Sequence, residues 1–130
     1  MIKFSYTIFY VEDVARSIEF YERAFGFKRK FVGPENDYGE LDTGATILSF
    51  AAVSLAEKNL PKGFVKSKLK EIPFGFEIGI TTPDVEKVYR ESVNAGAVPV
   101  QEAKVKPWGQ TVAYVRDPDG FLIEICTPMS

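Results

Sequence analysis

The carboxylate Glu124 lies in a stretch that is otherwise apolar, GFLIEICTPM at residues 120–129. Such a run is typical of a strand that is buried on both faces. An ionised carboxylate in that setting is costly unless it is paired, protonated or bound to a metal. Glu77 in FEIGIT is a second carboxylate in an apolar run. Together the two could share a proton, act as a general base or hold a cationic ligand.

The chain has no histidine, so the most common general base and metal ligand is missing. The single cysteine excludes an internal disulfide, and we expect a reducing, cytoplasmic setting. A net charge of −2 over 130 residues and a pI near 5.2 argue against nucleic acid or an anionic membrane as the main partner. No apolar run approaches the roughly 20 residues of a membrane span.

An internal repeat organises the elements that must position these carboxylates. VEDV at 11–14 and TPDV at 82–85 lie 71 positions apart, and each follows an extended apolar run. Each precedes a helical pattern that should begin at an aspartate N-cap, Asp13 or Asp84, and end before Gly26 or Gly96. Three strand patterns follow each helix: KRKFV, YGELDT and ATILSFAAV, then VPVQEA, QTVAYVR and FLIEICT. The chain is therefore predicted to be α+β, with the order βαβββ twice.

We interpret residues 1–130 as one domain made of two modules, about 1–54 and about 74–130. The linker between them, about 55–73, carries Pro61, Gly63, Pro73 and five lysines, and one short turn of helix could form there. Each module has a sheet face left over after its helix is packed, and each is too small to be stable alone. We therefore predict curved mixed sheets around a cavity, assembled as a homodimer.

Strand alternation predicts which side chains point into that cavity. In the last strand, Ile123 and Ile125 suit the helix side, which leaves Glu124 on the free face. The same alternation leaves Glu77 free in FEIGIT. A shift of 71 residues, with an ungapped alignment of the turns DTG and DPDG, extends the argument to the first module. The four positions predicted to be equivalent are Tyr6, Leu48, Glu77 and Glu124.

Four further side chains are candidates for binding a ligand. Trp108 in KPWGQ could stack on a flat molecule, or cover the edge of the core or a dimer contact. Gln110 and Tyr114 share a parity in the next strand and are predicted to line the cavity. Phe50 shares the parity of Leu48 and would make the cavity partly apolar.

The double βαβββ order, FYERAFGF at the end of the first helix, and YVRDPDGFLIEICTP near the C-terminus resemble the vicinal oxygen chelate superfamily. That group includes glyoxalase I, bleomycin resistance proteins and extradiol dioxygenases, and the resemblance covers essentially the whole chain. It implies their common fold, which hosts many activities. In the metal-dependent members the four equivalent positions usually hold His or Gln, then Glu or another ligand, then His, then Glu. Of the four residues here, only Glu124 matches.

This departure bears on cofactors and function. Leucine cannot bind a metal, neutral tyrosine is a poor ligand near pH 7, and two carboxylates remain. We predict no catalytic transition metal and no other cofactor, with weakly held Mg²⁺ or Mn²⁺ as the alternative. Two functions stay open. One is metal-free binding or sequestration of a small aromatic or cationic molecule, as in bleomycin resistance proteins. The other is a glyoxalase-like lyase, isomerase or dioxygenase-type enzyme that uses Glu77 and Glu124.

Overall fold

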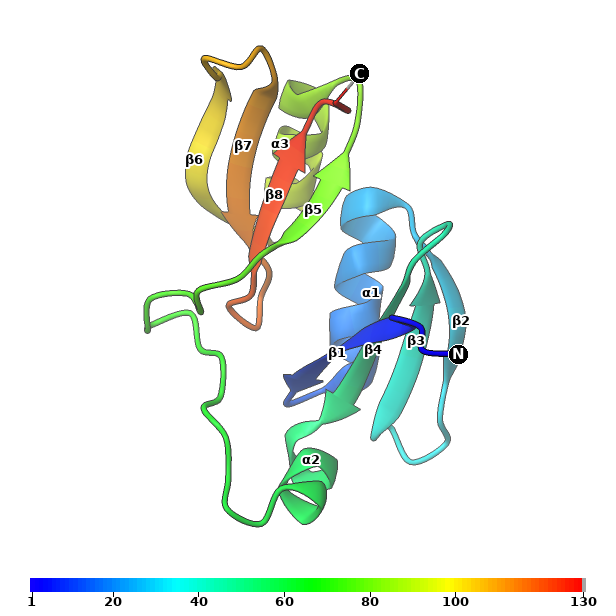
Figure 1. The fold of residues 1–130 in the computed structure, drawn as a ribbon. Helices are drawn as coiled ribbons and strands as arrows, with labels where there is room; N and C mark the ends of the chain where they lie inside the picture. Colours follow the sequence, from blue (N-terminus) through cyan, green and yellow to red (C-terminus); the bar gives the residue numbers. More distant parts are fainter. Residues whose placement is uncertain (130) are drawn as a thin grey trace. The chain divides into compact units, whose positions relative to one another are not determined.

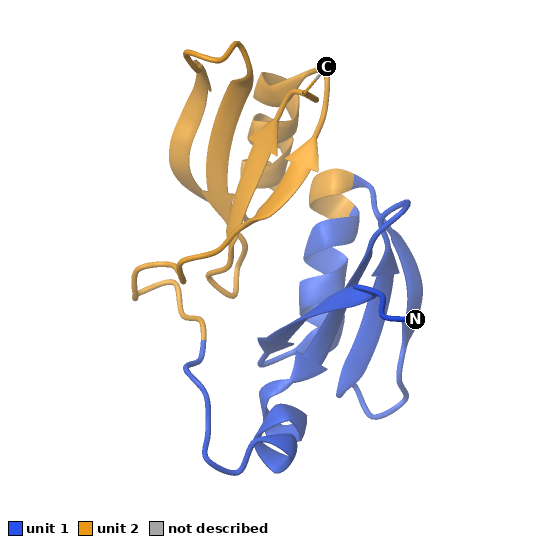
Figure 2. Cartoon of the chain, viewed as in Figure 1, with its two compact units in different colours: residues 1–22, 26–66 blue, residues 23–25, 67–130 orange. Residues whose placement is uncertain are grey.

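The computed structural model describes residues 1–129. They form two compact units, one made of residues 1–22 and 26–66, the other of residues 23–25 and the chain from Ser67 onward (Figure 2). Each unit carries a four-stranded sheet, and both sheets are mixed (Figure 1). The predicted α+β class and the repeated βαβββ order are confirmed. Within residues 1–129, no helix has the length and apolar character needed to cross a bilayer.

The strands and helices of the first half of the chain follow the predicted βαβββ order, with one further helix after the last strand. They are β1 (Tyr6–Val11), α1 (Val14–Phe25), β2 (Lys28–Val32), β3 (Tyr38–Asp42), β4 (Ile47–Ala52) and α2 (Val53–Asn59). The sheet order is β1-β4-β3-β2, with β1 parallel to β4 and the other neighbours antiparallel. The seven-residue helix α2 covers the junction between the predicted first module and the predicted linker, and its Val53 and Ala56 are buried.

The second unit repeats this arrangement. Its elements are β5 (Ile78–Thr81), α3 (Val85–Asn94), β6 (Val98–Val105), β7 (Thr111–Arg116) and β8 (Leu122–Cys126). The sheet order is β5-β8-β7-β6, and β5 is parallel to β8 just as β1 is parallel to β4. The helix α3 packs against β6, β7 and β8. In each sheet the first strand along the chain is therefore paired with the last strand along the chain.

The ends of both main helices form as their sequences predict. The carboxylate of Asp13 accepts a hydrogen bond from the Arg16 amide at 3.2 Å, and that of Asp84 accepts one from the Lys87 amide at 3.2 Å. These N-caps satisfy amides that have no partner inside the helix. Gly26 ends α1 in the left-handed region, with φ of 72°. The predicted capping residues are thus confirmed.

The helix-covered face of the first sheet is a dense aromatic core. The ring of Phe50 is fully buried and lies 5.4 Å from Tyr21 of α1 and 5.9 Å from Phe9 of β1, centroid to centroid. Gly39 of β3 lets α1 approach closely, because an added Cβ would lie 2.5 Å from Cδ1 of Ile18. The first unit is therefore held together chiefly by packing of α1 on this face.

Candidate functional site

Three strands of the second unit bring the predicted side chains onto one open sheet face. The register of β5, β8 and β7 places Gly79, Glu124 and Tyr114 in one row across the sheet. The neighbouring residues Ile123 and Ile125 are fully buried on the opposite face, against which α3 packs. The register therefore places Glu124 on the face away from the helix, which explains an acid in an apolar strand.

Glu124 is held by a neighbouring phenol. The Tyr114 hydroxyl donates a hydrogen bond to Oε1 of Glu124 at 3.2 Å. Burial, together with the negative charges of Glu77 and Glu124, raises the pKa of Tyr114 to about 12. Tyr114 therefore stays protonated at neutral pH and acts as a fixed hydrogen-bond donor to the carboxylate.

Glu77 lies immediately before β5, two residues ahead of Gly79 in the same alternation. Burial raises the pKa of Glu77, and the negative charge of Glu124 raises it further. The charge of Glu124 therefore disfavours a second negative charge on Glu77. A cation placed between them would remove this repulsion.

A chain of side-chain hydrogen bonds lies at the β6–β7 end of the same sheet. Trp108 Nε1 donates to Gln110 Oε1 at 2.8 Å, and Gln110 Nε2 donates to the carbonyl oxygen of Thr127 at 2.7 Å. The indole of Trp108 remains 63% exposed. A hollow of about 260 Å³ lies here, lined by Trp108, Gly109, Gln110, Thr127, Pro128 and Met129.

The single cysteine connects this chain to the carboxylates. Burial raises the pKa of the Cys126 thiol, and the adjacent charge of Glu124 raises it further. The thiol is therefore a neutral group at pH 7 and a poor nucleophile. Gln110, Tyr114, Glu124 and Cys126 accordingly share one face of the sheet, and Gln110 contacts the exposed indole of Trp108.

Leu48 and Phe50 of the first sheet were predicted to point into the cavity. That prediction is wrong. In the first sheet Ile8 is opposite Ser49, as Gly79 is opposite Glu124 in the second. The first unit has one more residue between its turn glycine and β4 than an ungapped alignment allows. A one-residue slip turns every side chain to the other face. Leu48 and Phe50 are consequently buried in the core, and Ser49 takes the position equivalent to Glu124.

The open face of the first sheet carries a polar group that was not predicted from the sequence. The Tyr38 hydroxyl donates to Oε2 of Glu40 at 2.8 Å, and Lys30 Nζ lies 3.4 Å from Oε1 of Glu40. Glu40 is opposite Ser49, and Tyr6 lies along the same face. The alternation in YGELDT already places Tyr38 and Glu40 on one face. The register of β4 is needed to show that this is the open face. The prediction that Tyr6 approaches Glu77 and Glu124 stays a prediction.

The side chains at the four equivalent positions do not fit a transition-metal site. The four equivalent positions hold a phenol, a hydroxyl and two carboxylates: Tyr6, Ser49, Glu77 and Glu124. In addition, residues 1–129 contain no cluster of three or more His, Cys, Asp or Glu side chains arranged to hold a metal ion. Zinc and related metals usually have three or four protein ligands with nitrogen or sulfur among them.

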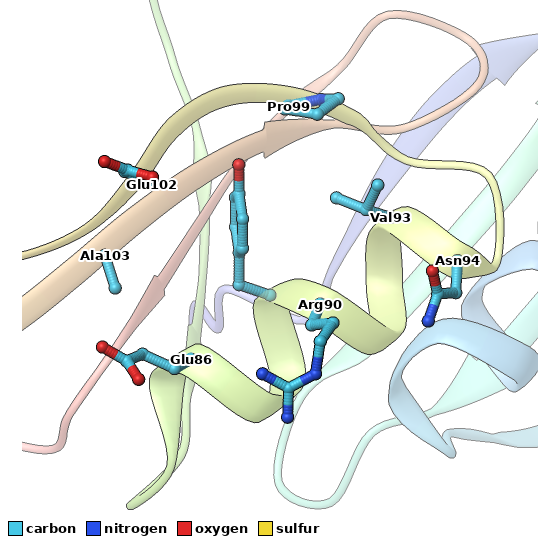
Figure 3. Close-up of a pocket in the computed structure, with 8 residues that line it drawn as sticks. Glu86, Arg90, Val93, Asn94, Pro99, Glu102 and Ala103 are labelled. Atoms are coloured by element: carbon cyan, nitrogen blue, oxygen red, sulfur yellow. The ribbon is translucent and has the colours of Figure 1, made fainter.

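A larger hollow lies away from these residues. It occupies about 480 Å³ between α3 and β6 (Figure 3). Its lining residues are Glu86, Tyr89, Arg90, Val93, Asn94, Pro99, Glu102 and Ala103. Pro99 is opposite Val115, two residues from Ala113, which pairs with the buried Ile125. The hollow therefore lies on the helix side of the sheet, and it contains none of the predicted site residues.

Comparison with known proteins agrees with this architecture. A lactoylglutathione lyase of Arabidopsis thaliana is 34% identical over 130 residues, covering 95% of this chain and 43% of the relative. A putative lactoylglutathione lyase of Brassica oleracea var. gemmifera is 33% identical with the same coverage. The chain thus spans less than half the length of these two relatives.

Solved structures share the fold. A glyoxalase-related enzyme from Fulvimarina pelagi superposes with a TM-score of 0.83 at 21% identity, covering 98% of this chain and 89% of that one. A glyoxalase/bleomycin resistance protein/dioxygenase family enzyme from Burkholderia phytofirmans PsJN gives 0.80 at 22% identity, covering 98% and 100%. The family model described as the Glyoxalase/Bleomycin resistance protein/Dioxygenase superfamily matches residues 3–125. This chain therefore belongs to the Glyoxalase/Bleomycin resistance protein/Dioxygenase superfamily.

Proposed function

We propose that this protein binds a small aromatic cation on the open face of its second sheet, without a catalytic transition metal. The observation that carries the proposal is the carboxylate pair. The charge of Glu124 raises the pKa of Glu77, and the Tyr114 hydroxyl donates a hydrogen bond to Glu124 on the same sheet face. A ligand with a positive charge and N–H donors gains charge-assisted hydrogen bonds and relieves the repulsion at the same time.

The neighbouring indole supports an aromatic ligand. Trp108 is exposed, and its hydrogen bond to Gln110 fixes the orientation of the ring. Trp108 lies in the turn between β6 and β7, six residues along the chain from Tyr114, so a ligand that reaches from the indole to Glu124 combines stacking with charge recognition. Phe50 does not contribute, since it belongs to the core. Sequestration of such a molecule needs no further chemistry from the protein.

Benzamidine, a flat aromatic amidinium, tests this proposal directly. Trp108 is the only tryptophan, so its fluorescence reports binding at this end of the sheet. We expect benzamidine to bind at pH 7 with an affinity that falls as salt is added, because salt screens the charge interaction. Benzamide has nearly the same shape without the charge and is the matched control. Equal binding of both compounds, or of neither, would remove the carboxylate pair as the basis of recognition.

The names of the two relatives favour a second candidate, a lactoylglutathione lyase. That chemistry uses a metal to polarise substrate oxygens, and the donor set here lacks imidazole. We expect protein purified without chelators to retain no stoichiometric Zn, Ni, Co or Fe. We also expect no lactoylglutathione to form from methylglyoxal and glutathione, with or without added Zn²⁺, Ni²⁺, Mn²⁺ or Mg²⁺. One equivalent of a transition metal that survives gel filtration, or metal-dependent product formation, would favour the lyase instead.

We also propose a homodimer. Along β1 and the residues before it, alternate side chains are apolar and exposed: Ile2, Phe4, Tyr6 and Ile8. β1 is an edge strand, so its outer backbone groups lack a partner strand within its own sheet. Apolar edges of this kind are usually covered in solution. Sedimentation at micromolar concentration should give a mass near twice that of the chain, and a monomer there would refute the dimer without affecting the fold.

A further inference from the structure

A buried arginine at the end of β7 binds the linker. Arg116 is only 8% exposed. Its Nε donates to the carbonyl oxygen of Gly120 at 2.8 Å, within the β7–β8 turn. Its Nη1 donates to the carbonyl oxygens of Leu69 and Glu71 at 3.0 and 2.7 Å, and Nη2 donates to that of Lys68 at 2.9 Å. One guanidinium therefore ties three linker carbonyls to the turn.

The turn glycine shows how closely the linker lies on this surface. A Cβ on Gly120 would be 2.9 Å from Nη2 of Arg116, from the carbonyl carbon of Lys68 and from Oγ of Ser67. The first unit's turn glycine, Gly44, has a similar positive φ, yet a Cβ there would meet nothing within 4 Å. Gly120 therefore provides space for the linker as well as a turn conformation.

Aromatic contacts also hold the later part of the linker, towards Glu77. The ring of Phe121, next to Gly120, lies 6.0 Å from Phe74 edge-on and 6.4 Å from Phe76. Phe74 and Phe76 also stack on each other at 6.4 Å. The residue after Phe76 is Glu77. The chain from residue 68 to residue 76 is thus held against the β7–β8 turn up to the point where the carboxylate begins.

We propose that Arg116 is a positioning residue for the candidate site: through the seated linker it holds Glu77 beside Glu124. The turn DPDG therefore reverses the chain and also anchors the linker that leads to Glu77. The part of this inference that concerns binding rests on the proposed function. The part that concerns the linker and the position of Glu77 does not.

The experiment compares three variants with the unchanged protein. Arg116→Met removes the donors but keeps an apolar stem, and Gly120→Ala keeps the arginine but pushes the linker and the guanidinium away sterically. Gly44→Ala is the matched control, because it introduces the same type of backbone strain where nothing lies against the new methyl group. Both variants should release the linker, so the test still works if one of them does not fold.

Three readouts follow, each at pH 7. The first is limited trypsin digestion: cleavage after Lys68 and Lys70 should rise at least about tenfold in Arg116→Met and Gly120→Ala, while cleavage after Lys62 stays unchanged. Lys68 is informative because its own carbonyl is held by Arg116. The second is the carboxyl ¹³C signal of Glu77, which should move in both variants and not in Gly44→Ala. The third is benzamidine affinity, which should fall about tenfold in both variants.

The outcomes separate the two levels of the proposal. Unchanged cleavage after Lys68 and Lys70 overturns the seated linker. Faster cleavage with an unmoved Glu77 signal makes Arg116 a structural residue only and overturns the positioning role. If the unchanged protein does not bind benzamidine, the proposed function fails, while the protease and Glu77 readouts still decide whether Arg116 positions that carboxylate.

Discussion

Replacing Phe50 with alanine is expected to lower the free energy of unfolding by about 3–5 kcal/mol. The ring is fully buried between Tyr21 and Phe9, so truncation removes its apolar burial and leaves a void that the sheet and α1 cannot fill. Urea denaturation followed by far-ultraviolet circular dichroism measures the change. An unaltered slope with urea would show that the cooperative unit itself is unchanged.

Phe31→Ala is the matched control in the same sheet. That ring is 43% exposed and contacts Tyr38 at 5.9 Å, so its removal should change the free energy of unfolding by less than about 1 kcal/mol. The pair also tests the correction of the sequence prediction. If Phe50→Ala keeps its stability but loses affinity for benzamidine, Phe50 belongs to the binding site as the sequence predicted.

Glu124→Gln is expected to weaken benzamidine binding by roughly 1.5–3 kcal/mol, the scale of one hydrogen bond to a charged group. The substitution keeps the shape of the side chain and leaves an oxygen that can accept from Tyr114. Fluorescence titration against the unchanged protein measures the loss. Glu102→Gln, in the hollow between α3 and β6, removes the same charge on the helix side of the sheet and should leave the affinity unchanged.

The same variant changes how stability depends on pH. The pKa of Glu77 is raised above its ordinary value of 4.5, so folding favours its protonated form. Its contribution to stability is present below pH 4.5 and is lost as the pH rises through the raised, folded-state pKa. Tyr114, with a pKa of about 12, does not titrate in this range.

Glu124→Gln removes the charge repulsion and leaves only burial to act on Glu77. The decline in thermal midpoint from pH 4.5 to 8 should therefore be shallower in the variant, and its midpoint at pH 7 should equal or exceed that of the unchanged protein. Thermal melts across this range for both proteins provide the measurement. A loss of several kcal/mol at every pH would instead make Glu124 a structural anchor, and the binding role would fail.

Local sequence signals determined most of the architecture. The repeated aspartate caps and glycine stops depend on backbone groups within one helical turn, so Asp13, Gly26 and Asp84 were recognisable without tertiary information. The free face of β8 was predictable for a similar reason. Ile123 and Ile125 alternate with Glu124, and strand alternation has a strict period of two.

Only the tertiary structure decided the features that depend on register and on contacts between distant residues. Sequence alignment could not place the extra residue before β4, and that single residue exchanges Leu48 for Ser49 on the open face. Nor does DPDG by itself predict that Arg116 reaches carbonyls 45 to 48 positions away. Those hydrogen bonds join backbone groups whose chemistry is the same in every residue, so only folding selects which ones meet the guanidinium.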